Sequence, residues 1–145
     1  KVKIATAHEP LQQGIVYLAP DNCHCLVNKA RENYEINLSP TPPINGFRPS
    51  VTALFNSVAT ICPKQSIGII LSGMGSDGAE GLLTMYEQKC LTIAQDENSS
   101  IVFGMPSAAI TLNAVSKILP LEMIAQFLIE QSTMTVKPAN LSKVF

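Results

Sequence analysis

The pattern of apolar and polar residues changes about one third of the way along the chain. Val2–Thr6 alternates between polar and apolar residues and Ile15–Leu18 follows a glycine, so both segments are predicted to be strands. Cys25–Val27 and Tyr34–Leu38 are predicted to be the arms of a β-hairpin, connected by the residues between them. Three prolines in Ser39–Gly46 exclude a helix or a central strand there. The first third is therefore expected to be rich in β-structure.

Beyond that loop, helical and strand patterns alternate, which implies parallel strands joined by right-handed crossovers. Such sheets bind ligands at the carboxyl ends of their strands, so the loops 72–78, 95–104 and 19–24 are the ones to inspect. The predicted helices are Val51–Ile61 with Ser50 as N-cap, Ala79–Lys89, Ser107–Asn113 behind Pro106, and Leu121–Gln131; the predicted strands are Ser66–Leu71, Cys90–Ala94 and Val115–Leu119.

The composition fits one globular domain and excludes several classes of function. The chain has 145 residues, of which 46% are hydrophobic and 14% charged, with a formal net charge of -1. No basic field exists for nucleic acid or anionic lipid, and the apolar runs are too short to span a bilayer. No signal peptide is visible in the first ten residues, KVKIATAHEP, so we expect a cytoplasmic protein with reduced cysteines.

The run Cys23-His24-Cys25 raises the question of a metal site. Neighbouring residues on a strand point to opposite faces, so these three side chains cannot all reach one ion. No second cluster of cysteine and histidine supplies further ligands. We therefore predict no metal.

The most informative segment is LSGMGSDGAEG, which begins at Leu71. Its glycines Gly73, Gly75 and Gly78 spell G-x-G-x-x-G after a strand and before a helix, as in a dinucleotide-binding turn. The acidic pair Asp96-Glu97 follows the next strand, where a ribose-binding residue would be expected. A dinucleotide-binding α/β domain is therefore one alternative.

Asp77 argues against a bound pyrophosphate. A carboxylate just before the third glycine repels an anion and competes for the N–H groups that would bind it. Two other roles remain open for this side chain. It can project over the edge of the sheet as a reactive group, or it can cap the helix that begins at Ala79, with Glu80 adding to the helix-dipole effect.

Four segments together resemble the catalytic domain of chemotaxis protein-glutamate methylesterases. They are GIVYLAPDNCH from Gly14, FRPSVTALFNSVA from Phe47, LSGMGSDGAEGL from Leu71 and TIAQDENSSIVFGMPSAAI from Thr92. The resemblance implies a modified doubly wound α/β fold with a mostly parallel sheet and a β-hairpin insertion in the N-terminal third. It implies a partial catalytic domain over residues 1–131, followed by a C-terminal tail over residues 132–145.

The resemblance also implies an activity. This family hydrolyses glutamate methyl esters on chemoreceptor helices through Ser, His and Asp, and some members deamidate glutamine. Asp77 matches the triad aspartate, and Met74 matches the residue whose backbone N–H serves the oxyanion hole. Gly73, Gly75 and Gly78 would shape their loop. No metal or organic cofactor is needed.

The chain departs from the family pattern in its missing serine and histidine. In the family, the nucleophile lies in a G-x-S-x-G-G loop and the histidine follows the next strand, both before the equivalent of Lys1. The sequence contains no G-x-S-x-G, so we expect little or no activity from these 145 residues alone. Structural roles are expected instead for the candidates that could replace them: His8, His24, Ser72, Ser76 and Ser107.

Further residues and partners complete the hypothesis. Arg48, Gln95, Asn98 and Met105 are candidates for the cleft, the last three on loops at the active edge of the sheet. Expected partners are methylated receptor helices, an upstream receiver domain, and a second chain that covers an exposed flank of the sheet. A non-catalytic receptor-binding module, or a degenerate relative, is the other alternative because the serine and histidine are absent.

Overall fold

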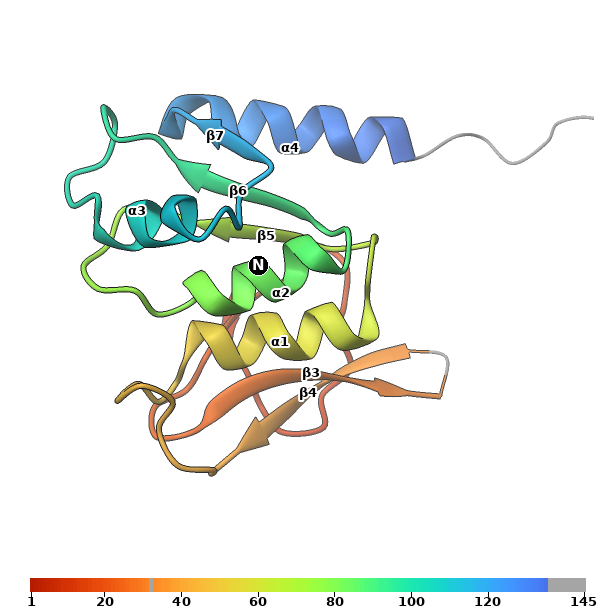
Figure 1. Ribbon diagram of the computed structural model, residues 1–145. Coiled ribbons are helices and arrows are strands. Elements are labelled where there is room, and N and C mark those ends of the chain that lie inside the picture. Colours follow the sequence, from red (N-terminus) through yellow and green to blue (C-terminus); the bar gives the residue numbers. More distant parts are fainter. Residues whose placement is uncertain (32, 136–145) are drawn as a thin grey trace, which may run out of the picture.

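The computed structural model describes residues 1–31 and 33–135, except for the side chains of residues 133–135. Helices and strands follow one another along the chain as Figure 1 shows. The strands are Val2–Ile4 (β1), Val16–Leu18 (β2), His24–Ala30 (β3), Asn33–Ser39 (β4), Ile67–Ile70 (β5), Leu91–Gln95 (β6) and Lys117–Leu119 (β7). The helices are Val51–Ile61 (α1), Ala79–Glu87 (α2), Gly104–Thr111 (α3) and Leu121–Thr135 (α4).

In the part of the chain that the structure describes, the strands form three separate sheets. β1 and β2 pair in parallel, β3 and β4 pair as an antiparallel hairpin, and β5, β6 and β7 form a parallel sheet. An α/β fold with parallel strands is thus confirmed. The predicted hairpin connection over residues 28–33 is wrong, because the ladder continues to the pair Ala30 and Asn33. Polar residues such as Asn28 and Lys29 pair through their backbones although they are exposed, so the apolar pattern ends before the strand does.

The main core lies between α1, α2, α3 and the parallel sheet. Its buried members include Phe55, Ile70, Leu82 and Met85. In Figure 1, α1 lies between α2 and the β3–β4 hairpin, and it contacts both. Apolar residues spaced by three or four positions place one stripe of each helix against this core. The loop between β5 and α2, described below, therefore lies next to helices that the main core holds in place.

Several predicted helix boundaries are wrong. α2 ends at Glu87 and α3 at Thr111, where Lys89 and Asn113 were expected. α3 begins at Gly104 and contains Pro106, whereas it was expected to begin behind that proline. Proline is tolerated in the first turn of a helix, where its missing N–H has no intrahelical partner to lose. α4 continues to Thr135, past the predicted end at Gln131. The rest of the predicted tail, residues 136–145, lies outside the described part.

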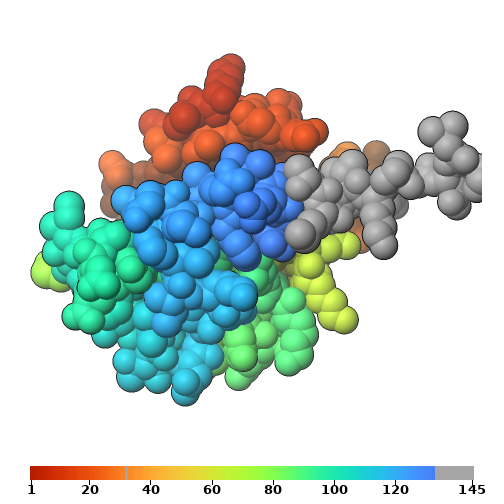
Figure 2. All heavy atoms as spheres, turned by 90° about the horizontal axis from the view of Figure 1, so that it is seen from above, coloured from red at the N-terminus to blue at the C-terminus, as the bar shows by residue number. Residues whose placement is uncertain are grey.

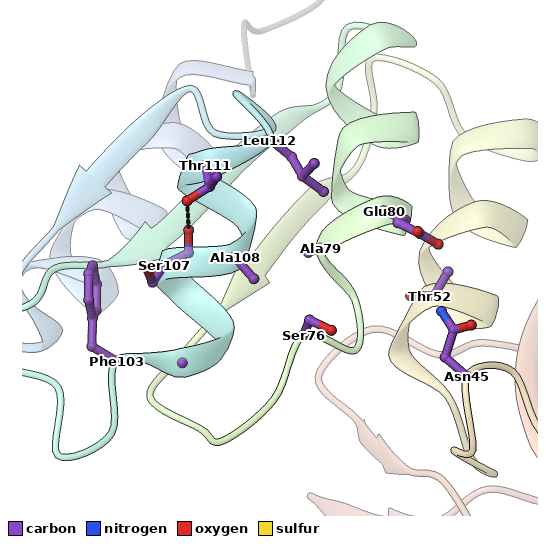
Figure 3. A pocket seen from close by; sticks show the side chains of 11 residues that line it. Asn45, Thr52, Ser76, Ala79, Glu80, Phe103, Ser107, Ala108, Thr111 and Leu112 are labelled. Atoms are coloured by element: carbon purple, nitrogen blue, oxygen red, sulfur yellow. Dashed lines mark hydrogen bonds between the residues drawn. The ribbon is translucent and has the colours of Figure 1, made fainter.

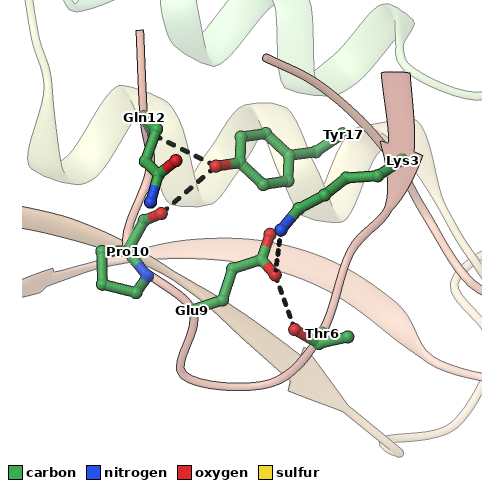
Figure 4. Close-up of polar contacts among 6 residues, drawn as sticks. All are labelled: Lys3, Thr6, Glu9, Pro10, Gln12 and Tyr17. Atoms are coloured by element: carbon green, nitrogen blue, oxygen red, sulfur yellow. Dashed lines mark hydrogen bonds and ion pairs between the residues drawn. The ribbon is translucent and has the colours of Figure 1, made fainter. Parts of the chain in front are cut away.

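Side-chain contacts hold the N-terminal segment together (Figure 4). The Lys3 ammonium lies 2.8 Å from a carboxylate oxygen of Glu9, and the Thr6 hydroxyl donates to the same oxygen at 2.6 Å. The Tyr17 hydroxyl donates to the carbonyl of Pro10 at 3.2 Å. The ammonium and the hydroxyl together keep the pKa of the Glu9 carboxyl below its usual value.

One surface of the N-terminal strands is apolar and exposed. Val2, Ile4, Val16 and Leu18 are each more than half exposed. Figure 2 shows these N-terminal segments, in red and orange, beside α4 in blue. Self-association through such a flank stays a prediction. Among the described residues, no helix combines the length and the hydropathy that a bilayer span requires.

Candidate active site

The loop that follows β5 is fixed against the segment that leads into α3. The N–H of Gly73 donates to the carbonyl of Val102 at 2.9 Å, and the carbonyl of Gly73 accepts from the N–H of Met105 at 2.9 Å. A Cβ atom on Gly73 would lie 2.6 Å from the sulfur of Met105, so a side chain here would displace Met105. Glycine therefore allows the loop to approach α3 closely.

Gln95 supports the same loop from beneath. Its side chain is buried, its Oε1 accepts from the N–H of Ser72 at 2.8 Å, and its Nε2 donates to the carbonyl of Ser99 at 2.8 Å. Gln95 was expected on a loop facing the cleft, but it ends β6 and its amide groups are used within the protein. Asn98 lies beyond it in an exposed turn.

The carboxylate of Asp77 binds the N-terminus of α1. Oδ1 accepts from the Ser50 hydroxyl at 2.8 Å and from the N–H of Thr52 at 3.2 Å, while Oδ2 accepts from the N–H of Val51 at 2.7 Å. Of the two roles left open for Asp77, capping of the helix that begins at Ala79 is therefore excluded, because that helix has no side-chain cap. A carboxylate is well placed at α1 because the first N–H groups of a helix lack intrahelical acceptors and carry partial positive charge.

The loop and α1 are bonded in both directions. The N–H of Gly78 donates to the Thr52 hydroxyl at 2.9 Å, opposite in direction to the bonds that Asp77 accepts. Gly78 has φ of 93°, and a Cβ atom there would lie 2.7 Å from Cγ1 of Val51. Glycine is thus required at position 78 by backbone conformation and by contact with α1. Gly75 also has positive φ, but it lies at the exposed side of the loop.

The half-buried Asp77 still has capacity for one more donor. A carboxylate has about four acceptor positions, and three of them are used by the donors on α1. A donor from outside the described contacts, such as an imidazole N–H, would complete the set. This arrangement suits a carboxylate that orients a histidine.

Met74 lies three residues before Asp77 and is open to solvent. Its side chain is 87% exposed. Within residues 1–31 and 33–135, no acceptor binds its backbone N–H, nor that of Gly75. Exposed N–H groups at a fixed glycine-rich turn can stabilise a developing oxyanion.

A cavity of about 550 Å³ opens on the side of the loop that carries Ser76 (Figure 3). One wall is polar, with Asn45, Thr52 and Glu80 around Ser76. The facing wall comes from α3 and the residues just before and after it. Phe103, Ala108 and Leu112 are its apolar members, and Ser107 and Thr111 lie among them. Its volume is in the range of small-ligand sites, and the side chain of one amino acid would fit.

The other cleft candidates are used within the fold. The Arg48 guanidinium donates to the carbonyls of Pro40 and Thr41 at 3.3 and 3.4 Å, so it holds the proline-rich loop. Met105 was expected on a loop but lies in the first turn of α3 and packs against the main core. In the described part of the chain, no three His, Cys, Asp or Glu side chains are grouped to hold a metal ion.

Two contacts of this site, one made by Ser50 and one by Thr52, cannot be predicted from the sequence. Ser50 was recognised as the N-cap of α1, which the structure confirms because its hydroxyl accepts from the N–H of Ala53 at 3.3 Å. Its second contact, to Asp77, joins residues 27 positions apart. Thr52 likewise binds Gly78 across 26 positions. The local pattern of apolar and polar residues does not predict contacts between residues so far apart in sequence. These contacts follow from the packing of α1 on α2.

Comparisons with known proteins show which family this chain resembles in sequence and in fold. The model of the CheB methylesterase family matches residues 1–128. A protein-glutamate methylesterase/protein-glutamine glutaminase of Nitrosomonas europaea is 48% identical over 126 residues, which are 87% of this chain and 35% of that protein. Its namesake from Salmonella typhimurium is 43% identical over 125 residues, covering 86% and 36% of the two chains.

A solved structure agrees with these relatives. The catalytic domain of Thermotoga maritima CheB methylesterase matches with a TM-score of 0.86 and 32% identity, over 89% of this chain and 68% of that one. The fold and loop thus define a methylesterase-type α/β domain. The chain belongs to the CheB methylesterase family, and it spans about a third of the length of the curated relatives it matches.

Proposed function

We propose that the chain is the part of a protein-glutamate methylesterase that supplies Asp77 to a Ser-His-Asp triad. The reaction is hydrolysis of glutamate methyl esters on chemoreceptor helices, with glutamine deamidation as a related activity. The serine would attack the ester carbonyl, the histidine would take its proton, and Asp77 would orient the imidazole and stabilise the imidazolium. The backbone N–H of Met74 would stabilise the oxyanion of the tetrahedral intermediate.

One observation carries this proposal. The Asp77 carboxylate is fixed by three donors of α1, yet one acceptor position remains for an imidazole. A carboxylate used only as a helix cap would serve α1 equally well deep in the core, whereas Asp77 is half-buried beside the exposed Met74. The cavity beside Ser76 supports the proposal because it lies next to this loop and can hold a side chain of a receptor helix.

The test uses a longer protein that carries a G-x-S-x-G-G turn and a histidine ahead of Lys1. Asp77→Asn keeps the shape of the side chain but removes its charge and replaces one acceptor oxygen with an NH2 donor. We expect kcat for release of methanol from a methylated receptor to fall by about 10³- to 10⁴-fold. Glu87→Gln, which changes an exposed carboxylate at the last position of α2 and outside the lining of the cavity, is the matched control. Near-normal turnover of Asp77→Asn would contradict the assignment.

A second candidate is a receptor-binding module without catalysis. The absence of G-x-S-x-G from the sequence favours it, together with a loop and cavity that are intact without a nucleophile. Binding of a methylated receptor fragment by the 145-residue chain, measured by calorimetry, would support this function if the longer protein shows no hydrolysis. Single-turnover acylation of the 145-residue chain by an ester probe would contradict it.

The partners and location follow from the same proposal. Receptor cytoplasmic helices are the expected substrates, and the protein would act in the cytoplasm with a receiver domain ahead of the catalytic domain. No metal or organic cofactor enters the proposed reaction, since the triad and the backbone donors supply all its steps.

A further inference from the structure

His24 is a buried histidine whose two ring nitrogens both have partners. It begins β3 and is 1% exposed. Its Nδ1 accepts from the backbone N–H of Ser50 at 3.2 Å, and its Nε2 lies 3.1 Å from the carbonyl oxygen of Pro42. Because a carbonyl only accepts, these partners assign the hydrogen to Nε2 of a neutral ring. Neither of these two hydrogen bonds is part of the proposed Ser-His-Asp triad.

The contact with Ser50 brings His24 to the donors that hold Asp77. Ser50 gives its hydroxyl to Asp77, and the next two residues give their backbone N–H groups. His24 therefore holds the backbone N–H of Ser50, while Asp77 holds the hydroxyl of the same residue and the N–H groups of the next two. A shift of Ser50 would move all three donors of Asp77 together.

We propose that His24 is a positioning residue for Asp77. By fixing the N–H of Ser50, it determines where the Asp77 carboxylate lies and where its remaining acceptor position points. The ring must be neutral for this role, since an imidazolium would place an N–H of His24 against the N–H of Ser50. The inference rests on the proposed catalytic role of Asp77, because positioning matters for rate only if Asp77 orients the histidine of the triad.

The two contacts of the ring allow a sharp test of this role. A purely structural histidine would act through Pro42, by holding the proline-rich loop, whereas a positioning histidine acts through Ser50. His24→Asn places its Oδ1 at the same bond distance from Cβ as Nδ1, so it can accept from Ser50 but cannot reach Pro42. His24→Gln places its amide nitrogen near the position of Nε2, so it keeps a donor for Pro42 and loses the acceptor for Ser50.

The first measurement is kcat and KM of methyl ester hydrolysis in the longer protein. We expect His24→Gln to lower kcat about 10- to 100-fold at nearly constant KM, because a misplaced catalytic group costs rate and leaves substrate binding intact. The conservative His24→Asn should rescue most of that loss. Ser50→Ala removes one donor to Asp77 on the same path and should lower kcat about tenfold even if the His24→Gln protein is too unstable to assay. Equal losses for Asn and Gln, or an unchanged kcat in Ser50→Ala, would overturn the positioning role.

The second measurement needs no activity and uses the 145-residue chain. The amide resonances of Val51 and Thr52 and the carboxyl ¹³C resonance of Asp77 report the contacts directly. They should move in His24→Gln and stay close to the parent in His24→Asn, and the reverse pattern would refute the proposal. If Asp77→Asn lowers hydrolysis while neither His24 variant does, the inference fails and the proposed function stands. If Asp77→Asn has no effect on rate, the proposed function fails, and the resonances alone decide whether His24 positions Asp77.

Discussion

The loop between β5 and α2 contacts the N-termini of two helices, α1 and α2, and these two helices are capped in different ways. α1 has Ser50 as an N-cap and receives the Asp77 carboxylate as a second acceptor from another part of the chain. α2 begins at Ala79 with Gly78 as its N-cap, which offers no side chain to cap it, and its acidic first-turn residue Glu80 is exposed. The aspartate next to the start of α2 in sequence thus serves the other helix.

This difference shows how the loop can be both rigid and chemically available. A local cap would bind Asp77 into the first turn of α2 and use its acceptors on neighbouring N–H groups. A cap on α1 instead ties the loop to a separate helix, and it leaves the N–H groups of Met74 and Gly75 without acceptors among the residues described. The contact of Asp77 with α1 stabilises the loop, and the backbone N–H groups of Met74 and Gly75 stay available to a ligand.

The largest expected effect on stability comes from removing the acceptor that serves α1. Asp77→Ala deprives the Ser50 hydroxyl and two helix N–H groups of their partner, so we expect a loss of about 2–4 kcal/mol. Glu80→Ala, the matched change at α2, should cost less than about 0.5 kcal/mol because this carboxylate is exposed. Urea unfolding of the 145-residue chain measures both, and equal losses would show that the two helix starts do not differ as described.

A second comparison separates packing from backbone conformation within the loop. Gly78 and Gly75 both have positive φ, but only a Cβ at position 78 would overlap with Val51 of α1. Gly75→Ala should cost about 1 kcal/mol, whereas Gly78→Ala should cost about 2–4 kcal/mol because overlap adds to the strained φ. Unfolding free energies from urea titration test this order. Similar costs at the two positions would mean that the loop does not press on α1.

The return bond from α1 to the loop should have a smaller effect. Thr52→Val keeps the buried volume but leaves the N–H of Gly78 without its acceptor, which should cost about 1–2 kcal/mol. Thr84→Val is the control, since the hydroxyl of the half-buried Thr84 donates to the carbonyl of Glu80 one turn earlier in the same helix. That change should stay within about 0.5 kcal/mol. Hydrogen exchange of the Gly78 amide should also accelerate in Thr52→Val, and unchanged protection would argue against this bond.

Sequence pattern predicted most elements of the fold but not how the site is connected. Apolar spacing located α1, β5 and α2, since each buries a stripe or a whole strand in the core. The predicted hairpin ends are wrong because polar residues continue the ladder beyond the apolar pattern. The predicted start of α3 is wrong because a proline can lie in the first turn of a helix, and the predicted end of α4 is wrong because the end of a helix has only a weak pattern. The six-residue motif G-x-G-x-x-G, with Gly73, Gly75 and Gly78, can be found in the sequence from its glycines alone. Which helix receives Asp77 depends on tertiary packing, and no spacing along the chain specifies it.

A third carboxylate, Glu9, extends the comparison from helix N–H groups to an ammonium partner. Hydrogen bonding by Lys3 first and Thr6 second, with the charge of Lys3, lowers the pKa of Glu9 in the folded protein. A lowered folded-state pKa contributes stability that is present above the unfolded-state pKa of about 4.3 and is lost as the pH falls through the folded value. Lys3→Met should therefore reduce the free energy of unfolding at pH 7, and this part of the loss should shrink as the pH falls below the folded-state pKa of Glu9. The control Lys117→Met changes a lysine on the exposed β7 and should show no such pH-dependent difference. A loss that is equally large at pH 7 and in acid would mean that the contact of Lys3 with the Tyr17 ring, whose centroid lies 5.4 Å from Nζ, stabilises the segment without the charge of Glu9.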